Sequence, residues 1–141
     1  MAVRTTPATT TAPARFAFLR ITVVLQTLAL LFQAVTAGLL LSSSHGEVLH
    51  SVGARVMYGA SMLYVLAAIL AWRPGGGSPR PILHASGFLA LASAQVALGI
   101  AHKPALHVPL GVLMFALSVL ALRQSLVASL TDVSPGRSLR P

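Results

Sequence analysis

Residues 21–41 read ITVVLQTLALLFQAVTAGLLL, an apolar run that contains no charged side chain. A helix needs ~20 such residues to cross the hydrocarbon core of a bilayer. An unpaired backbone amide in hydrocarbon costs several kcal/mol, so a run of this length without alternation forms a helix rather than a strand. Three further apolar runs follow at residues 52–72, 82–100 and 107–122. The sequence therefore predicts an all-α, polytopic membrane protein, a bundle of four antiparallel transmembrane helices.

The composition of the whole chain agrees with this class. Of the 141 residues, 55% are apolar and 9% are charged, and the mean hydropathy is +0.81, whereas soluble domains carry about 25% charged residues. The net charge of +8 comes from 10 Lys and Arg against 2 acids. These basic residues are scattered rather than clustered on one face, which argues against a nucleic-acid partner. The chain has no cysteine, which excludes disulfides, thiolate metal sites and a covalently attached c-type haem.

The predicted membrane domain covers residues 16–130 and lies between two polar tails. Residues 1–15 are rich in Thr, Ala and Pro, and residues 131–141 are polar, so both are expected to be disordered. The stretch RPGGGSPRP at residues 73–81 predicts a turn between the second and third helices. The fourth run is short for a span, but it can continue through Arg123, whose long side chain can reach the headgroups, as far as residue 130.

The positions of Lys and Arg predict the orientation of the chain, because cytoplasmic loops carry an excess of them. In a four-span arrangement Arg55 and Lys103 fall on one side. The other eight basic residues fall on the opposite side: Arg4, Arg15, Arg20, Arg73, Arg80, Arg123, Arg137 and Arg140. We therefore expect a multi-pass protein of the cell membrane, with both termini in the cytoplasm and the lipid bilayer as its surroundings.

In this orientation the histidines gather at the outer surface. His45, His50, His102 and His107 all lie at that end, and only His84 lies at the inner end. His50 and His107 begin the second and fourth spans, which run in the same direction, so the two imidazoles can face each other at similar depth. Such a pair can supply both axial ligands of a non-covalently bound b-type haem, which requires no cysteine.

The residues that follow each histidine are alike. At about 100° per residue, His50 shares a helix face with Gly53 and Met57, and His107 shares one with Gly111 and Met114. The glycines would give a flat macrocycle room to approach the backbone, and the polarizable methionine side chains would pack against the macrocycle. Upstream of these residues, QAVTAG at 33–38 is similar to QVALG at 95–99. The sequence thus predicts two pseudo-repeated helical hairpins.

Three segments resemble the heme A synthase family: Glu47-Val-Leu-His50, Gln95-Val-Ala-Leu-Gly99 and Leu106-His107. Members of that family usually contain two four-helix halves in tandem, each with a histidine pair on its second and fourth helices. The resemblance covers roughly residues 26–122, one half only. It implies that His50 and His107 are axial haem ligands and that Glu47 stands where the family has an acid needed to oxidise a haem methyl group.

The chain departs from the family pattern at two points. Ser51 follows His50 where the family usually has Arg. Arg55 or Lys103 would then have to bind the haem propionates. One half supplies a single haem site, so oxidation of a haem group would require a homodimer or another partner half. A relative that binds haem and only transfers electrons fits equally well.

Each candidate also has an interpretation without a cofactor. His50 and His107 can be amphipathic rings at the membrane interface. His45 and His102 are expected to be solvated loop residues, with propionate contact as the alternative. His84 is expected to be an interfacial or quinone-adjacent residue and not a ligand. Glu47 can act as a base or hold the tautomer of His50, or it can simply stabilise the start of its helix. The whole chain can accordingly be a cofactor-free accessory or scaffold subunit of a larger membrane complex.

Polar residues inside the spans should face other helices, because they need partners in hydrocarbon. Gln26 and Gln33 lie seven residues apart in the first span. His84, Gln95 and His102 fall within about 20° of one face of the third helix. We expect both faces to point into the bundle and to connect the helices by hydrogen bonds. No acidic residue lies within a span, which argues against an ion-coupled transporter.

Overall fold

The computed structural model describes residues 11–73 and 78–132, and these residues form four helices and no strand. The helices are α1 (Thr11–Leu39), α2 (Gly46–Trp72), α3 (Arg80–Ile100) and α4 (Pro104–Asp132). Each contains a segment that is long and apolar enough to cross a membrane: Phe16–Leu39, Gly46–Trp72, Arg80–Ile100 and Pro104–Ala128. The predicted all-α bundle of four membrane-spanning helices is confirmed.

The helices differ from the predicted segments mainly at their ends. α1 begins at Thr11, so residues 11–15 are helical although the sequence suggested a disordered tail, and residues 1–10 lie outside the described part. α4 runs from Pro104 to Asp132, well past the predicted span at 107–122. Residues 131 and 132 are therefore helical, whereas residues 133–141 and linker residues 74–77 are not described. Hydropathy marks the hydrocarbon-crossing part of a helix, and intrahelical hydrogen bonds extend the helix beyond it.

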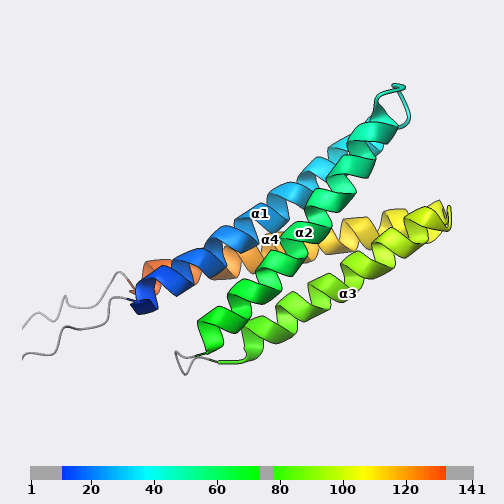
Figure 1. The fold of residues 1–141 in the computed structure, drawn as a ribbon. Helices are drawn as coiled ribbons and strands as arrows, with labels where there is room; N and C mark the ends of the chain where they lie inside the picture. The colour runs from blue at the N-terminus through cyan, green and yellow to red at the C-terminus, as the bar shows by residue number, and fades with distance from the viewer. Residues whose placement is uncertain (1–10, 74–77, 133–141) are drawn as a thin grey trace, which may run out of the picture.

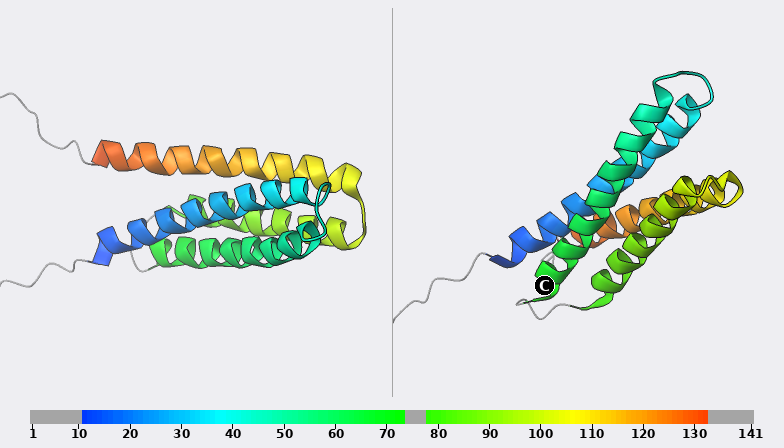
Figure 2. Two further views of the ribbon diagram at one scale, coloured as in Figure 1. Left: turned by 90° about the horizontal axis from the view of Figure 1, so that it is seen from above. Right: turned by 45° about the vertical axis from the view of Figure 1, so that its right-hand side comes forward.

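The four helices form two antiparallel hairpins, α1–α2 and α3–α4 (Figure 1). Each helix packs against two neighbours, because α1 also contacts α4 and α2 also contacts α3. α2 and α4 therefore lie diagonally opposite each other in the bundle, and so do α1 and α3. The two hairpins diverge towards the end that carries the α1–α2 and α3–α4 connections (Figures 1 and 2).

The interior of the bundle combines apolar side chains with several polar ones, and its outer surface is strongly apolar. The buried side chains include Thr22, Gln26, Thr36, Ser61 and Ser118, each at most 1% exposed. By contrast, large apolar side chains such as Leu28, Val56 and Val112 are more than half exposed. The exposed apolar surface differs from that of a water-soluble domain and suits a lipid environment, where hydrogen bonds and close packing hold helices together.

The two connections at the diverging end are tight turns. Gly46, at the start of α2, is buried against the end of α1, and a Cβ atom there would lie 2.5 Å from the backbone carbonyl of Leu39. In the other connection His102 has a φ of 50°, and the Lys103 N–H donates to the Leu98 carbonyl. This is the usual way for a helix to end with a left-handed residue. The turns place the first residues of α2 and α4 at the same end of the bundle.

Candidate functional site: the histidine pair at the diverging end

The structure brings together His50 and His107, from the beginnings of α2 and α4. Their ring centroids are 6.1 Å apart and the ring planes make an angle of 66°. Both rings are half-buried. Because α2 and α4 do not pack directly against each other, the two imidazoles bridge the diagonal of the bundle.

The His107 ring has a well-defined hydrogen bond. Its Nδ1 atom lies 3.0 Å from the backbone carbonyl oxygen of Gln95 on α3. A carbonyl oxygen only accepts, so Nδ1 carries the proton and the neutral ring has its lone pair on Nε2. Gly99 lets the ring lie close to α3, because a Cβ atom there would be 3.4 Å from His107 Cε1. The packing of α3 against α4 thus fixes both the position and the tautomer of His107.

The Nδ1 atom of His50 has a side-chain hydroxyl as its hydrogen-bond partner, not a backbone carbonyl. It lies 3.1 Å from Thr36 Oγ1 on α1, and the same hydroxyl is 3.1 Å from the backbone carbonyl of Gln33. Glu47 was expected to be able to hold this tautomer, but its side chain is exposed in the first turn of α2 and Thr36 occupies the Nδ1 position. Thr36 is not among the site residues that the sequence predicts. Its polar character three residues after Gln33, in an apolar helix, is the signal that could have identified it.

Gln33 and Gln95 occupy the space beside the two glycines. A Cβ atom at Gly53 would lie 2.6 Å from Gln33 Oε1, and one at Gly111 would lie 2.9 Å from Gln95 Nε2. The space beside these glycines, which the sequence analysis assigned to a macrocycle, is filled by glutamine side chains in this structure. They allow a glutamine of the first helix in each hairpin to pack against the backbone of the second.

The amide of Gln33 also binds the α2 backbone around His50. When its oxygen faces Ala54 N at 2.7 Å, its nitrogen donates to the His50 carbonyl oxygen at 3.1 Å and to Thr36 Oγ1 at 3.1 Å. This orientation satisfies both ends of the amide. Gln33 therefore joins α1 to α2 directly beneath the histidine pair.

The remaining predicted site residues lie on different parts of the bundle. Met57 and Met114 are 3% and 0% exposed, two turns deeper than the histidines. Arg55 and Lys103 are exposed, as are His45, His84 and His102. His84 and His102 therefore do not point into the bundle with Gln95, since the buried face of α3 consists of Ala85, Phe88, Ala92 and Gln95.

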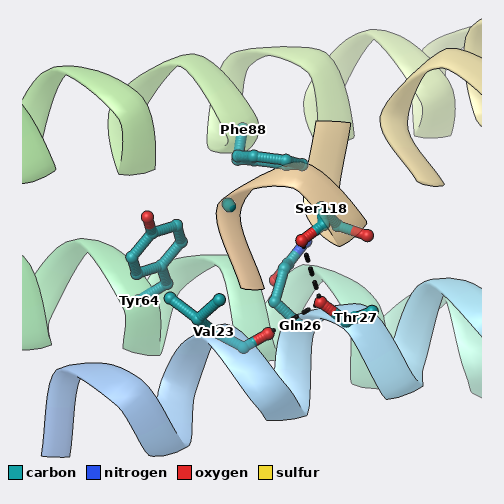
Figure 3. Close-up of a pocket in the computed structure, with 7 residues that line it drawn as sticks. Val23, Gln26, Thr27, Tyr64, Phe88 and Ser118 are labelled. Atoms are coloured by element: carbon teal, nitrogen blue, oxygen red, sulfur yellow. Dashed lines mark hydrogen bonds between the residues drawn. The ribbon is translucent and has the colours of Figure 1, made fainter. Parts of the chain in front are cut away.

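A second polar layer lies deeper in the bundle, among Gln26, Thr27, Ser61 and Ser118. Ser61 Oγ lies 3.1 Å from Gln26 Oε1, which links α1 to α2. Thr27 Oγ1 lies 3.3 Å from the Ser118 carbonyl oxygen, which links α1 to α4 (Figure 3). Within the described residues, Gln26 Nε2 and Gln95 Oε1 are buried without a hydrogen-bond partner. The small hollow beside Gln26, closed by Tyr64 and Phe88, has no volume that would take a water molecule. This layer holds helices together and offers no space for a ligand.

The two hairpins repeat each other in residue spacing. His50 and His107, Met57 and Met114, and Ser61 and Ser118 all lie 57 positions apart. On the preceding helices, Gln33 and Gln95 lie 62 positions apart, as do the core residues Leu30 and Ala92. Both glutamines pack against the glycine that follows the histidine in their own hairpin. The packing therefore supports the pseudo-repeat that the sequence suggests.

No protein-family model, curated protein or solved structure matches this chain. Within residues 11–73 and 78–132, no three His, Cys, Asp or Glu side chains are grouped so that they could hold a metal ion. A zinc site made only of protein ligands requires four such groups. The histidine pair therefore offers two nitrogen donors, fewer than such a site requires.

Proposed function

We propose that this protein is a multi-pass membrane protein that binds one b-type haem between His50 and His107 and acts in electron transfer. The observation that carries the proposal is the spacing of the two rings. Two imidazole nitrogens that bind one metal ion at ~2 Å lie ~4 Å apart, and the ring centroids stand about 1 Å further back on each side. The resulting separation of ~6 Å is close to the 6.1 Å between the His50 and His107 centroids, and haem ligation requires in addition that the Nε2 atoms of both rings point at the iron.

The donor chemistry of the pair also supports haem. Both Nδ1 atoms have partners on the preceding helix of their own hairpin, Thr36 and the Gln95 carbonyl, which leaves the Nε2 atoms as candidate donors. Histidine ligands of metals commonly use their second nitrogen in this way. Haem would supply one-electron redox chemistry here. Two protein ligands on one iron leave it no open axial position, which favours electron transfer over chemistry at the metal.

Haem occupancy requires the glutamine amides to make room. The atoms that approach Gly53 and Gly111 include the amide ends of Gln33 and Gln95, so haem binding would require these amides to move and Gln33 to give up its bonds to the α2 backbone. The hairpins already diverge at the end where the histidines lie (Figure 2). Arg55 and Lys103 are exposed at this end and available to haem propionates.

The resemblance to heme A synthases supports a second activity for the same site. Oxidation of a haem group would use Glu47 as the acid beside the pair, and it would require a second copy of this chain, because each chain has one histidine pair. Electron transfer requires only one copy and does not depend on Glu47. Haem binding in Glu47→Gln is therefore expected to be unchanged under either activity, and only an oxidation activity would be lost.

The alternative proposal is a cofactor-free accessory or scaffold subunit of a larger membrane complex. It is favoured by the contacts of Gln33 and Gln95, which fill the space beside the glycines without any ligand. The absorption spectrum of protein purified from haem-replete cells distinguishes the two proposals. A reduced b-type α band that disappears in His50→Ala and His107→Ala, and persists in His84→Ala, supports haem binding. A stable, colourless protein supports the scaffold role.

The charge distribution supports an orientation with both termini in the cytoplasm. Of the described basic residues, Arg20, Arg73, Arg80 and Arg123 belong to the end of the bundle where the chain enters and leaves it, and Arg55 and Lys103 belong to the end with the histidine pair. Lys and Arg are enriched in cytoplasmic segments. The haem would then lie towards the outer leaflet of the cell membrane.

A further inference from the structure

We propose that the end of α2 and the start of α3 form a binding site for the headgroup of an anionic phospholipid, with Arg73 and Arg80 as the side chains that bind its phosphate. The site lies at the opposite end of the bundle from the histidine pair. It goes beyond the proposed function and does not depend on haem. Its ligand comes from the leaflet on the side where α1 begins and α4 ends.

Arg73 and Arg80 lie at the ends of two neighbouring membrane-spanning segments. The segment of α2 ends at Trp72, directly before Arg73, and the segment of α3 begins at Arg80. The two helices pack against each other, and only six residues separate the two arginines in the sequence (Figure 1). Trp72 is half-buried, and tryptophan is enriched at the interface between membrane and water. Both guanidinium groups therefore lie at the depth of the lipid headgroups.

The positive charge of these two arginines is not balanced within the described part of the chain. Both side chains are exposed, and neither has an acidic partner among residues 11–73 and 78–132. The chain has two acidic residues: Glu47 lies at the other end of the bundle, and Asp132 ends α4 beyond its membrane-spanning segment. A guanidinium group presents a planar fork of N–H donors that matches a phosphate group. An anionic headgroup therefore fits both the charge and the donors of this site.

Local contacts hold both arginines in place before any ligand binds. The Arg73 Cζ atom lies 4.9 Å from the centroid of the Trp72 ring. This cation–π contact uses no hydrogen-bond acceptor, so the N–H donors of the guanidinium stay available to an anion. On the other side, the backbone N–H of Arg80 donates to Ser78 Oγ at 3.3 Å, which stabilises the start of α3. The site therefore requires little rearrangement to bind a headgroup.

The surface of α3 that continues from Arg80 into the membrane suits the rest of a lipid molecule. At 100° per residue, Arg80, His84 and Gly87 fall within about 60° of one helix face. His84 is exposed one turn below Arg80 and adds a ring N–H donor close to the headgroup. Gly87 is also exposed, and a Cβ atom there would meet nothing within 4 Å. An acyl chain can therefore lie along α3 at Gly87 while its phosphate binds Arg80.

The fluorescence of Trp72 tests the proposal, because Trp72 is the only tryptophan of the chain and belongs to the site. The purified full-length protein is reconstituted in vesicles of phosphatidylcholine and phosphatidylglycerol, and one of the two lipids carries brominated acyl chains. Bromine quenches tryptophan on contact, so quenching by each lipid in turn gives the relative affinity of the two at Trp72. Each value is divided by the fluorescence in unbrominated lipid, which removes direct effects of a substitution on Trp72.

Arg80→Gln is the test variant, since it leaves the contact between Arg73 and Trp72 in place. Arg123→Gln is the matched control, because it removes the same charge at the same end of the bundle but from α4, which does not pack against α2. A basic residue near a membrane surface favours anionic lipid about fivefold, so Arg80→Gln should lower the preference for phosphatidylglycerol about fivefold. Arg80→Lys and Arg123→Gln should keep the preference of the unmodified chain.

Equal quenching by the two lipids in the unmodified chain, or an unchanged preference in Arg80→Gln, overturns the proposal. An equal loss of preference in Arg123→Gln also overturns it, because only the total charge would then matter. Glycerol phosphate, which carries the phosphate without acyl chains, distinguishes the two sources of this anion. It should not relieve the quenching by brominated phosphatidylglycerol, and relief would identify free phosphate as the ligand instead of a lipid. If Arg80→Gln loses its helical circular dichroism, Arg73→Gln gives the same comparison.

Discussion

The side chain of Gln33 lies so close to Gly53 that a Cβ atom on the glycine would be 2.6 Å from Gln33 Oε1 and 2.9 Å from the ring of Phe32. Such distances are shorter than any normal carbon contact. The side chains of Gln33 and Phe32 therefore occupy space that a side chain at residue 53 would need.

Gly53→Ala is therefore expected to lower the stability of the protein by about 1–3 kcal/mol, the usual cost of an overpacked contact. The control is Gly59→Ala on the same helix, where a Cβ atom meets nothing within 4 Å. Alanine there should leave stability unchanged or raise it by up to about 1 kcal/mol through helix propensity. Thermal unfolding in detergent measures both, and an equal loss in the two variants would contradict the close contact.

His102→Gly is expected to stabilise the protein by roughly 1 kcal/mol, because a left-handed conformation costs a residue with a Cβ atom about that amount. The φ of His102 is 50°, whereas His45 in the other connection has a φ of −81°. His45→Gly should therefore bring no such gain. Stability is compared by thermal unfolding, and a loss of stability in His102→Gly would show that its side chain contributes more than its strained backbone costs.

Gln26→Leu is expected to keep or raise stability, by up to about 1–3 kcal/mol, since it removes the buried Nε2 atom that has no partner. Ser61, which lies 3.1 Å from Gln26 Oε1, keeps an acceptor in the Met57 carbonyl oxygen at 3.0 Å. Gln33→Leu should lower stability, because the Gln33 amide binds the backbone around His50. Chemical or thermal unfolding of the two variants tests this, and a destabilised Gln26→Leu would indicate an unseen partner for its amide.

The proposed orientation predicts that Ser43 is accessible from outside the cell and Ser78 from the cytoplasm. The chain contains no cysteine, so Ser43→Cys and Ser78→Cys each introduce a single reactive thiol. A membrane-impermeant maleimide should label Ser43→Cys in intact cells and Ser78→Cys only after the membrane is opened. Both serines are exposed, so access to the membrane side decides the result. The reverse labelling pattern would place the termini outside.

The sequence predicted the four spans closely because the hydropathy of a segment alone decides whether it can cross a membrane. The third helix, predicted at 82–100, is Arg80–Ile100. The ends of the helices were harder to predict, as at Thr11 in α1 and Asp132 in α4. Intrahelical hydrogen bonds extend both helices beyond the segment that hydropathy marks. The fold class and the number of helices thus follow from local composition.

The partners of individual side chains required the tertiary structure. The sequence placed His50 and His107 at one end of the bundle, but the contact between their rings depends on how the two hairpins cross. It also suggested Glu47 as a partner of His50, whereas the fold supplies Thr36 from another helix. The glycines after each histidine were identified as places of close approach, but their neighbours are Gln33 and Gln95. Sequence periodicity shows which residues share one face of a helix. Only the packing of the helices decides which residues of a neighbouring helix lie against that face.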